Sequence, residues 1–522
     1  MPRPKPNEKT DKPAKNAEPM AVIDVGSNEL RLRIAENKGG VMKFLESASV
    51  PLNLGGDTFA HGRISFEKLG RACEIIKNFL TLSADYGVSQ YKVVATTAVR
   101  ESENRDYILD QIKIKTGVSV SVIDDSEEKL YVYKLMSHLA PEEFLKSAMM
   151  VYTGSGNVGL SVWRDGRSFY SESVKIGSLR ISEVFGDMQD YCSCFPTLAD
   201  DYIKSYMCLL DGDFSHKIKH FITSGQEISM IADLTGAASD SGFYHIEAKK
   251  LSALFEEIKS KSVERVASDY DISEEKAEVL LPALCIYRAL LNFTEAEVIL
   301  TPLVYLTDAL MFEMLYPDQF SRISRELDKS TLLSARAISE KFRDLTAHSA
   351  LVEKFAVQIF DKLKKIHGMG KREKLLLQTA AILHDVGKYV NIKHHSFHSR
   401  NIICGCEIIG LNGLEKEIVA QICRYHSKTS PNEGHADYAR LPVGYKVLVS
   451  KLAAILKLAD ALDRGHNQKF SGIEAALNDD GLVITVTTSK NIDLEIWYYS
   501  EKSRLFEEVF GIKTAVRHKK PV

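Results

Sequence analysis

Two glycine turns, each set between apolar runs, constrain the fold of this chain more than any other feature of its sequence. The first lies in Ala21–Leu30, which reads Ala-Val-Ile-Asp-Val-Gly-Ser-Asn-Glu-Leu. The second lies in Ala148–Trp163, where Tyr-Thr-Gly-Ser-Gly-Asn-Val-Gly separates two apolar segments. Apolar runs of this length, bounded by turn residues, are typical of buried strands. Each segment therefore predicts a strand, a tight turn and a returning strand.

The two turns open two blocks with the same alternation of strands and helices. In the first block we expect strands at 20–24, 30–35, 42–50, 91–95 and 119–123, and helices at 66–86, 102–116 and from Ser126 onward. In the second block, from about 145 to 315, we expect strands at 168–175, 220–223 and 297–300, with helices between them. Two α/β lobes of one plan indicate an internal structural duplication.

The character of the sequence changes after the second block. Between about Asp318 and His466 there is almost no strand signal, and we expect helices at 331–343, 350–366, 372–384, 398–408, 415–425 and 445–464. The tail from Gly472 returns to strands, which we expect at 473–477, 482–487 and 493–498. An all-helical domain followed by a small α/β domain is therefore predicted.

The composition excludes several classes of protein. With 522 residues, a formal net charge of −3 and 45% apolar residues, the chain reads as a soluble protein of about two to four domains. No apolar run approaches the roughly 18 residues that cross a bilayer, and the net charge gives no reason to expect specific nucleic-acid binding. We expect cytoplasmic residence, no membrane partner, and cysteines that are reduced because they are few and scattered.

The first turn has the chemistry of a phosphate-binding loop. Successive backbone N–H groups in a concave turn suit phosphate oxygens, and Gly26 permits the close approach of a ligand. Asp24, just before the turn, suits a divalent cation because hard cations prefer carboxylate oxygen. Taken alone, such a turn is more often an ordinary hairpin.

Several motifs together resemble the exopolyphosphatase / guanosine pentaphosphate phosphohydrolase (Ppx/GppA) family, which belongs to the sugar kinase–Hsp70–actin superfamily. The motifs are Ile23–Asn28 with Leu30–Leu32, then Ala95–Arg100 (Ala-Thr-Thr-Ala-Val-Arg), then Glu127-Glu128 entering a helix, and Lys175–Glu183. The resemblance covers the chain from about residue 20 to its end. It implies an α/β plus α fold: actin-like (ribonuclease H-like) lobes at 20–140 and 141–317, an all-helical HD-type domain at 318–470 and a small α/β domain at 471–522. The Pro- and Lys-rich composition of residues 1–19 predicts a disordered tail.

The resemblance also implies roles for particular residues. Phosphate would be bound by Gly26, Ser27, Asn28 and Arg100 on one side and by Gly154, Ser155, Gly156 and Asn157 on the other. Glu128 would be the catalytic glutamate that acts on water, with Asp24 holding Mg²⁺ in the cleft between the lobes. Glu127 is the neighbour that a shift of one residue would select, and both glutamates are also acids that a helix dipole favours in a first turn.

The second turn departs from the family pattern, which reads approximately Asp-x-Gly-Gly-Gly-Ser-Thr-Glu. Tyr152 stands in place of the first acid and Gly159 in place of the final glutamate, while Ser155, Asn157 and Val158 replace the middle glycine, the serine and the threonine. Two carboxylates that could share a cation or a water are absent. Phosphate binding is therefore less affected by these departures than catalysis is.

The helical region carries a second set of candidate ligands. His384-Asp385 follows an apolar helix, His348 precedes it and Asp460 follows it. This order resembles the HD phosphohydrolase superfamily, where the corresponding residues hold a divalent metal ion. His398 and His426 are the histidines that we assign to a second ion. One or two divalent transition-metal ions would clamp a phosphate and activate water, although Gly387 is equally compatible with a plain helix end.

Three hypotheses follow from these motifs. The first is a phosphoanhydride hydrolase that removes the terminal phosphate of polyphosphate or guanosine pentaphosphate in the cleft between the lobes. The second places metal-dependent hydrolysis of a nucleotide or phosphoester at the HD-type cluster. The third is a catalytically weakened protein that binds polyphosphate or a guanosine penta- or tetraphosphate and regulates a partner. The resemblance implies a homodimer.

Overall fold

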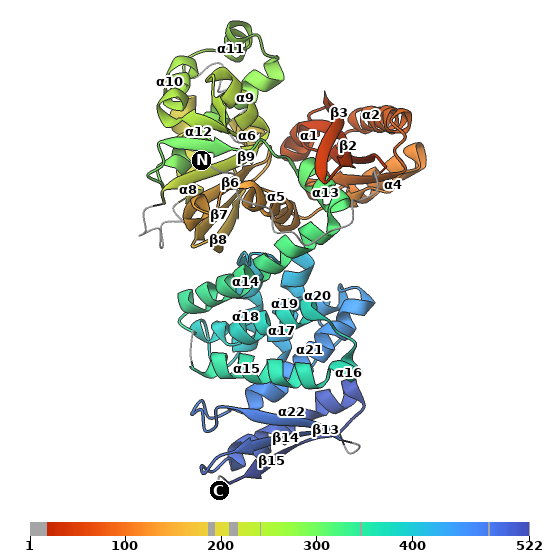
Figure 1. The fold of residues 1–522 in the computed structure, drawn as a ribbon, viewed down its shortest axis with the longest axis vertical. Helices are drawn as coiled ribbons and strands as arrows, with labels where there is room; N and C mark the ends of the chain where they lie inside the picture. The colour runs from red at the N-terminus through yellow and green to blue at the C-terminus, as the bar shows by residue number, and fades with distance from the viewer. Residues whose placement is uncertain are drawn as a thin grey trace. The chain divides into compact units, whose positions relative to one another are not determined.

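The structure is a computed structural model, and it describes residues 18–185, 194–207, 218–240, 242–344, 347–478 and 481–520. The predicted tail at 1–19 lies outside these residues except for its last two. The chain divides into two compact units, one made of residues 1–166 and 173–325 and the other of residues 167–172 and 326–522. Each unit is described by itself (Figure 1).

The first α/β lobe is built on a five-stranded sheet with the order β3-β2-β1-β4-β5. Its strands are β1 (Met20–Val25), β2 (Glu29–Lys38), β3 (Val41–Pro51), β4 (Gln90–Ala95) and β5 (Ser121–Val122). Its helices are α1 (Leu54–His61), α2 (Phe66–Asp85), α3 (Thr97–Glu101), α4 (Arg105–Thr116) and α5 (Asp125–Leu139). Apolar residues of β1, β2 and α2 meet in one hydrophobic core.

The second lobe is built on a seven-stranded sheet with the order β10-β11-β12-β9-β6-β7-β8. Its strands are β6 (Ser147–Thr153), β7 (Val158–Arg164), β8 (Arg167–Val174), β9 (His220–Gly225), β10 (Ala238–Asp240), β11 (Phe243–Glu247) and β12 (Val298–Thr301). Its helices are η1 (Phe144–Lys146), α6 (Ser178–Phe185), α8 (Phe195–Met207), α9 (Gln226–Leu234), α10 (Ala248–Ile258), α11 (Val263–Tyr270) and α12 (Glu274–Leu291). The chain then returns to the first lobe, where α13 (Leu306–Leu315) packs on β1, β2 and α5.

The two sheets repeat one connection pattern. In the first lobe, β1 forms an antiparallel hairpin with β2 and pairs in parallel with β4, which pairs in parallel with β5. In the second lobe, β6 does the same with β7 and β9, and β9 pairs in parallel with β12. The predicted structural duplication is therefore present, and it places the two glycine turns at equivalent positions in the two sheets.

The second unit is helical and ends in a small sheet. Its helices are α14 (Pro317–Lys341, which begins in the first unit), α15 (Ala347–Lys362), α16 (Lys364–His367), α17 (Lys371–Leu383), η2 (Val386–Tyr389), α18 (His395–Gly405), α19 (Gly413–Tyr425), α20 (Ala436–Ala439), α21 (Val443–Ala461) and α22 (Asp493–Phe510). The strands β13 (Ile473–Asn478), β14 (Gly481–Thr487) and β15 (Thr514–Lys519) form the sheet β13-β14-β15. One hydrophobic core joins the helices to this sheet, and α22 packs on α21.

The prediction of a strand at 493–498 is wrong, because these residues begin helix α22. The buried side chains of α22 recur at intervals of three and four residues, which is the helical period: Glu495, Tyr499, Lys502 and Phe506. Trp497 is 59% exposed, so the segment presents only one face to the core.

The cysteine prediction holds for five described residues and fails for one. Cys73, Cys285, Cys404, Cys406 and Cys423 are free, whereas Cys194 is disulfide-bonded. The prediction used sequence spacing, which does not tell which thiols meet in the fold.

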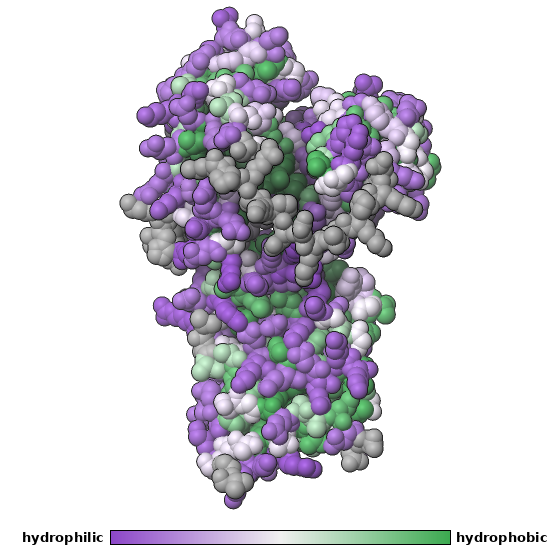
Figure 2. Space-filling model, in the orientation of Figure 1, coloured by the Kyte–Doolittle hydropathy of each residue, from purple (hydrophilic) through white to green (hydrophobic). Residues whose placement is uncertain are grey.

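No helix of the described residues is long and apolar enough to cross a membrane. Hydrophilic residues cover much of the face that Figure 2 shows, with smaller hydrophobic areas between them.

Candidate functional site

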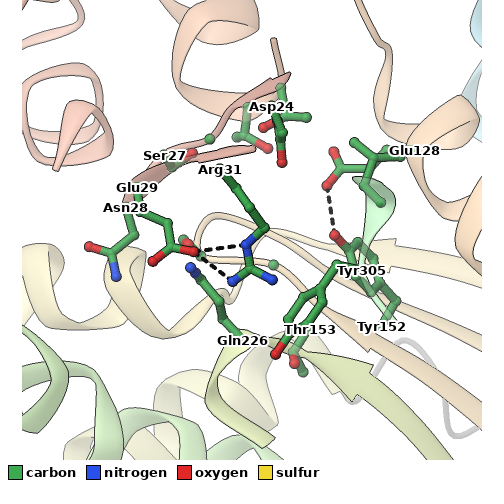
Figure 3. A pocket seen from close by; sticks show the side chains of 16 residues that line it. Asp24, Ser27, Asn28, Glu29, Arg31, Glu128, Tyr152, Thr153, Gln226 and Tyr305 are labelled. Carbon is green, nitrogen blue, oxygen red and sulfur yellow. Dashed lines mark hydrogen bonds and ion pairs between the residues drawn. The ribbon is translucent and has the colours of Figure 1, made fainter. Parts of the chain in front are cut away.

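The turn between β1 and β2 is packed closely against its own hairpin. Gly26 N donates to Glu29 O at 3.1 Å, and a Cβ on Gly26 would lie 2.7 Å from that oxygen, so only glycine fits. The hydroxyl oxygen of buried Ser27 accepts a hydrogen bond from Ala98 N at 3.1 Å, which ties the turn to α3. Asp24, near the end of β1, lines the adjoining pocket (Figure 3).

Both glycine turns contribute to this pocket, together with α3, α5 and the loop before α13. The lining residues are Asp24, Gly26, Ser27, Asn28, Glu29, Arg31, Thr96, Thr97, Glu128, Tyr152, Thr153, Gly154, Ser155, Gln226, Tyr305 and Leu306. The fold therefore brings together seven of the predicted residues: Asp24, Gly26, Ser27, Asn28, Glu128, Gly154 and Ser155. The predicted residues outside the lining are Arg100, Glu127, Gly156 and Asn157.

Asp24 and Glu128 are two of the three carboxylates that line the pocket, with Glu29 as the third. Asp24 Oδ1 is buried and has no hydrogen-bond partner among the described residues. Burial, and then repulsion from Glu128, raises the pKa of Asp24 to about 7. Burial also raises the pKa of Glu128. The positive charge of Arg100 opposes this rise, since its Nη1 lies 3.6 Å from Glu128 Oε2. A buried carboxylate oxygen without a donor, next to a second acid, fits a hard cation such as Mg²⁺.

The second turn holds the catalytic candidate through a phenol. Tyr152 Oη donates to Glu128 Oε1 at 3.2 Å (Figure 3). Gly154 N donates to Asn157 O at 2.9 Å and closes the turn. A Cβ on Gly156 would lie 2.8 Å from Thr97 Cγ2, so the turn packs directly on α3. The turn thus keeps its close backbone approach although its acids are gone.

Other side chains fill the space around the altered positions of this turn. Asn157 Nδ2 donates to Asp125 Oδ1 at 2.8 Å, and Lys129 Nζ lies 2.8 Å from Asp125 Oδ2. A Cβ on Gly159 would lie 2.3 Å from Lys129 Cδ. A side chain at position 159 would therefore need the space that Lys129 occupies, so the two positions are coupled.

Arg100 and Glu127 do not line the pocket, but both lie next to Glu128, which does. The Arg100 guanidinium donates to Ile123 O and to Thr97 Oγ1, each at 2.8 Å. Together with its contact to Glu128, this arrangement orients the carboxylate from outside the pocket. Glu127 is half-buried on the same helix, where burial and then Asp124 raise its pKa. Of the two neighbouring glutamates, Glu128 is the one that lines the pocket.

Sequence reasoning missed Arg31, Tyr305 and Gln226 in the lining. Arg31 Nη2 lies 2.6 Å from Glu29 Oε1, and Arg31 Cζ lies 3.7 Å from the centroid of the Tyr305 ring. Arg31 is the register partner of Asp24 in the β1–β2 hairpin, so the hairpin pattern contained a signal for it. Tyr305 and Gln226 come from distant segments, for which the sequence had no such signal.

A second cavity of about 290 Å³ shares Asn28, Glu29, Arg31, Gln226 and Tyr305 with the pocket. Its other charged lining residues are Glu227, Asp233, Glu275 and Lys276. Carboxylates thus outnumber cations around it, as they also do in the pocket, where Arg31 is the one cation in the lining.

In the second unit, four histidines direct Nε2 toward a pair of carboxylates. Their Nδ1 atoms bond to oxygen: His348 to Asp463 Oδ2 at 2.9 Å, His384 to Ala381 O at 2.8 Å, His395 to Ile392 O at 2.9 Å and His426 to Cys423 O at 2.5 Å. An oxygen acceptor at Nδ1 assigns the proton there and leaves the Nε2 lone pair for a metal. Nε2 of His348 and of His384 is buried and has no hydrogen-bond partner among the described residues.

One group of potential ligands surrounds Oδ2 of Asp385. This oxygen lies 3.4 Å from His384 Nε2 and 3.8 Å from His348 Nε2, and Asp460 Oδ1 lies 3.4 Å from His348 Nε2. All four residues are buried. The nitrogen and carboxylate donors fit a divalent transition metal.

A second group surrounds the other oxygen of the same carboxylate. Asp385 Oδ1 lies 3.4 Å from His395 Nε2 and 3.7 Å from His426 Nε2, and these two nitrogens lie 3.2 Å apart. Asp385 thus faces two sets of nitrogen donors, as a bridging ligand of a two-metal site does. We call these residues, with His348, His384 and Asp460, the histidine–aspartate cluster.

His395 lies where the sequence reasoning expected His398. His398 is half-buried and contacts the neighbouring ring of Phe397, with ring centroids 5.8 Å apart. Both residues lie on α18, and the helix turns the first of them toward Asp385. The sequence reasoning also missed His466, whose ring stacks on His348 with centroids 3.6 Å apart.

Comparison with known proteins gives consistent matches. The family model described as "Ppx/GppA phosphatase family" matches residues 33–316, and "Ppx/GppA phosphatase, domain III" matches residues 332–496. A guanosine-5'-triphosphate,3'-diphosphate pyrophosphatase of Pseudoalteromonas translucida is 23% identical over 439 residues, 82% of this chain and 83% of the relative. A protein of the same name from Vibrio atlanticus is 20% identical over 483 residues, 90% of this chain and 92% of the relative.

A solved structure shares the α/β fold. The exopolyphosphatase from Cytophaga hutchinsonii aligns with a TM-score of 0.52 at 18% identity, covering 57% of this chain and 97% of its own. This likeness confirms the prediction of two actin-like α/β lobes.

Proposed function

The chain belongs to the Ppx/GppA phosphatase family, and we propose that it hydrolyses the terminal phosphoanhydride bond of guanosine pentaphosphate or inorganic polyphosphate in the pocket between the two glycine turns. The observation that carries this proposal is the convergence of Asp24 and Glu128 in one pocket with the backbone of Gly26 and Gly154. Two of the pocket walls are close-packed glycine turns, which suit a phosphate group held by backbone N–H donors.

Glu128 acts as the base in this reaction. Water attacks the terminal phosphorus, and the Glu128 carboxylate accepts the proton that the water releases. A carboxylate with a raised pKa is the stronger base near neutral pH, and burial supplies that rise. Tyr152 and Arg100 contact different oxygens of Glu128 and so fix its orientation. The phosphoryl oxygens are met by the turn amides and by Arg31, a guanidinium that lines the pocket.

Asp24 and Glu128 are the residues that would hold Mg²⁺ in the pocket. When bound, the ion neutralises charge on the phosphoryl oxygens. The orphaned Oδ1 of Asp24 and its raised pKa, which an adjacent cation would lower, support this assignment.

The adjoining cavity favours guanosine pentaphosphate over long polyphosphate. A polyanion extending from the pocket into this cavity would meet Glu227, Asp233 and Glu275, and like charges repel. A nucleoside offers N–H and O–H donors that carboxylates accept. The names of the relatives, guanosine-5'-triphosphate,3'-diphosphate pyrophosphatases, agree with this choice.

Paired substitutions test the reaction. In Glu128→Gln we expect kcat for phosphate release to fall by about 10²–10⁴, because the amide cannot accept the proton. Glu127→Gln is the matched control, since it makes the same change one residue away, outside the pocket lining, and it should retain activity. Phosphate release is measured with guanosine pentaphosphate and with polyphosphate, and equal rates in wild type and Glu128→Gln contradict the proposal.

The histidine–aspartate cluster supports a second candidate function. We propose that it binds one or two divalent transition-metal ions, one held by His348, His384, Asp385 and Asp460 and the other by Asp385, His395 and His426. The specific observation in favour is the set of Nδ1 bonds that leaves four Nε2 atoms directed at Asp385 and Asp460. A bound metal supplies Lewis acidity toward a phosphoester or nucleotide, the chemistry that the HD-type resemblance implies.

Two further proposals come from the sequence, the first from its composition and the second from the family resemblance. We propose that the enzyme acts in the cytoplasm and that it is a homodimer. Sedimentation of the purified chain tests the second of these.

A further inference from the structure

Two lysines beside the histidine–aspartate cluster are buried without an ion pair among the described residues. Lys457 on α21 is 3% exposed, and its Nζ donates to Ser430 Oγ at 3.4 Å. Lys502 on α22 is 6% exposed, and its Nζ donates to the main-chain oxygen of His426 at 3.2 Å. The hydrogen bonds of both lysines therefore go to neutral oxygen atoms.

An ammonium group buried in this way is costly, because water is removed and no opposite charge replaces it. Burial, and then repulsion from Lys502, lowers the pKa of Lys457 to about 7. Glu508 opposes this effect, but its carboxylate already pairs with Arg504 at 2.8 Å. Burial also lowers the pKa of Lys502 to about 8, and the charge of Asp460 opposes this effect. Neither lysine forms an ion pair among the described residues, so a bound anion would hold both in the charged form.

Tyr498 and Arg464 connect these lysines to the cluster. Lys502 Nζ lies 5.0 Å from the centroid of the Tyr498 ring, and Arg464 Cζ lies 4.4 Å from the same centroid. Tyr498 and Lys502 are four residues apart on α22 and so share one face of the helix. Burial, and then the charge of Asp460, raises the pKa of Tyr498, so this face lies within the field of the cluster carboxylate.

We infer that Lys457, Lys502 and Arg464 bind a phosphate group, free or as a phosphomonoester, beside the histidine–aspartate cluster, so that helix α22 completes the site. This inference rests on the metal site proposed above. Metal ions held at Asp460 and His426 would add positive charge beside these two lysines. A phosphate dianion has enough oxygen atoms to contact the metal ions of the cluster and the basic side chains at the same time. A neutral ligand would leave the charge of the lysines without compensation.

The test titrates the full-length protein with inorganic phosphate and with phenyl phosphate after loading with Co²⁺. Metal content is counted first by mass spectrometry, and the Co²⁺ visible spectrum is assigned to the cluster by its loss in Asp385→Asn. We expect both anions to change this spectrum. In Lys502→Met we expect the dissociation constant of phosphate to rise at least tenfold while the Co²⁺ content is unchanged. Arg464→Gln should weaken binding in the same direction.

Matched variants separate charge from folding. Lys502→Arg keeps the positive charge and should bind phosphate within about threefold of wild type, and Lys490→Met removes an exposed lysine and should change nothing. The melting temperature of each variant is measured alongside. If Lys502→Met and Arg464→Gln are folded, hold Co²⁺ and bind phosphate as wild type does, the inference is overturned while the metal site stands. If wild type binds no Co²⁺, the metal proposal fails, and phosphate affinity measured by calorimetry then decides the role of the lysines.

Discussion

Tyr152 stands in place of the first acid of the family pattern and changes the chemistry of the second glycine turn. The family pattern implies an acid at this position, whereas here a phenol donates to Glu128 Oε1 at 3.2 Å. Burial, and then the charge of Glu128, raises the pKa of Tyr152 well above its usual value, so the phenol stays protonated and donates. Tyr152 is thus a positioning residue that acts through Glu128 and takes no charge into the pocket.

The Tyr152→Phe variant should move the pH profile of hydrolysis. Glu128 accepts a proton only when it is deprotonated, so kcat rises as the pH passes upward through its pKa. The bond from Tyr152 lowers that pKa, and its removal raises the pKa, so the rising limb of kcat should shift to higher pH. Tyr107→Phe, at a 72% exposed tyrosine, is the control. An unshifted limb contradicts the assigned role.

Gly159 and Lys129 form a second coupled pair at the residue scale. In Gly159→Ala the new Cβ would lie 2.3 Å from Lys129 Cδ, and we expect a loss of about 1–3 kcal/mol of unfolding free energy from overpacking. In the double variant Gly159→Ala/Lys129→Ala the new methyl group no longer meets the lysine side chain. The double variant should therefore lose less unfolding free energy than the two single variants added together. Denaturant unfolding of the four proteins measures this, and strict additivity would argue against the contact.

At the scale of elements, the start of α5 decides which of two neighbouring glutamates lines the pocket. The sequence suggested Ser126 as the residue that opens this helix, whereas the structure caps it with Asp124, whose side chain accepts from Glu127 N at 2.8 Å. The helix therefore begins at Asp125, and the side chain of Glu128, in its first turn, lines the pocket. Arg100, from α3, holds the same carboxylate, so two elements define one side chain.

Removing the cap should affect stability and catalysis together. In Asp124→Ala we expect a loss of about 1 kcal/mol of unfolding free energy and a lower kcat, because the first turn of α5 carries Glu128. Asp124→Asn keeps an oxygen that can accept from Glu127 N and should restore most of both. Thermal unfolding and phosphate release are the measurements, and equal losses in the two variants contradict the capping role.

At the scale of the whole molecule, the chain carries two separate candidate sites in two compact units. The pocket belongs to residues of the first unit, and the histidine–aspartate cluster belongs to residues of the second. Each site has its own buried carboxylates and its own means of orienting them. The chemistry of one therefore does not require residues of the other.

Asp385→Asn tests that independence. The amide cannot bridge two ions as a carboxylate does, so we expect the content of bound transition metal to fall at least tenfold. Phosphate release from guanosine pentaphosphate should stay within about threefold of wild type. Metal content and phosphate release are measured on the same preparation. A loss of hydrolysis as large as that in Glu128→Gln contradicts independence.

Much of the architecture was predictable from periodicity and turn residues. The two glycine hairpins, the duplicated lobes and the helical region followed from local patterns, because apolar spacing reports secondary structure directly. The helix that begins at residue 493 was not predictable in this way, since its buried face includes Glu495 and Lys502, which a hydrophobic pattern does not count. His395 was passed over for His398 because the rotation of α18 about its axis depends on what the helix packs against.

By itself the sequence determined which residues could do chemistry here: the turn at Asp24–Asn28, the pair Glu127-Glu128, and the order of histidines and aspartates along the helical region. Only the tertiary structure decided which of them meet. It selected Glu128 over Glu127, set Tyr152 against Glu128, and filled the space beside Gly159 with Lys129. The physical reason is that spacing along the chain reports local conformation, whereas a site is made by side chains from distant segments whose directions are set by packing.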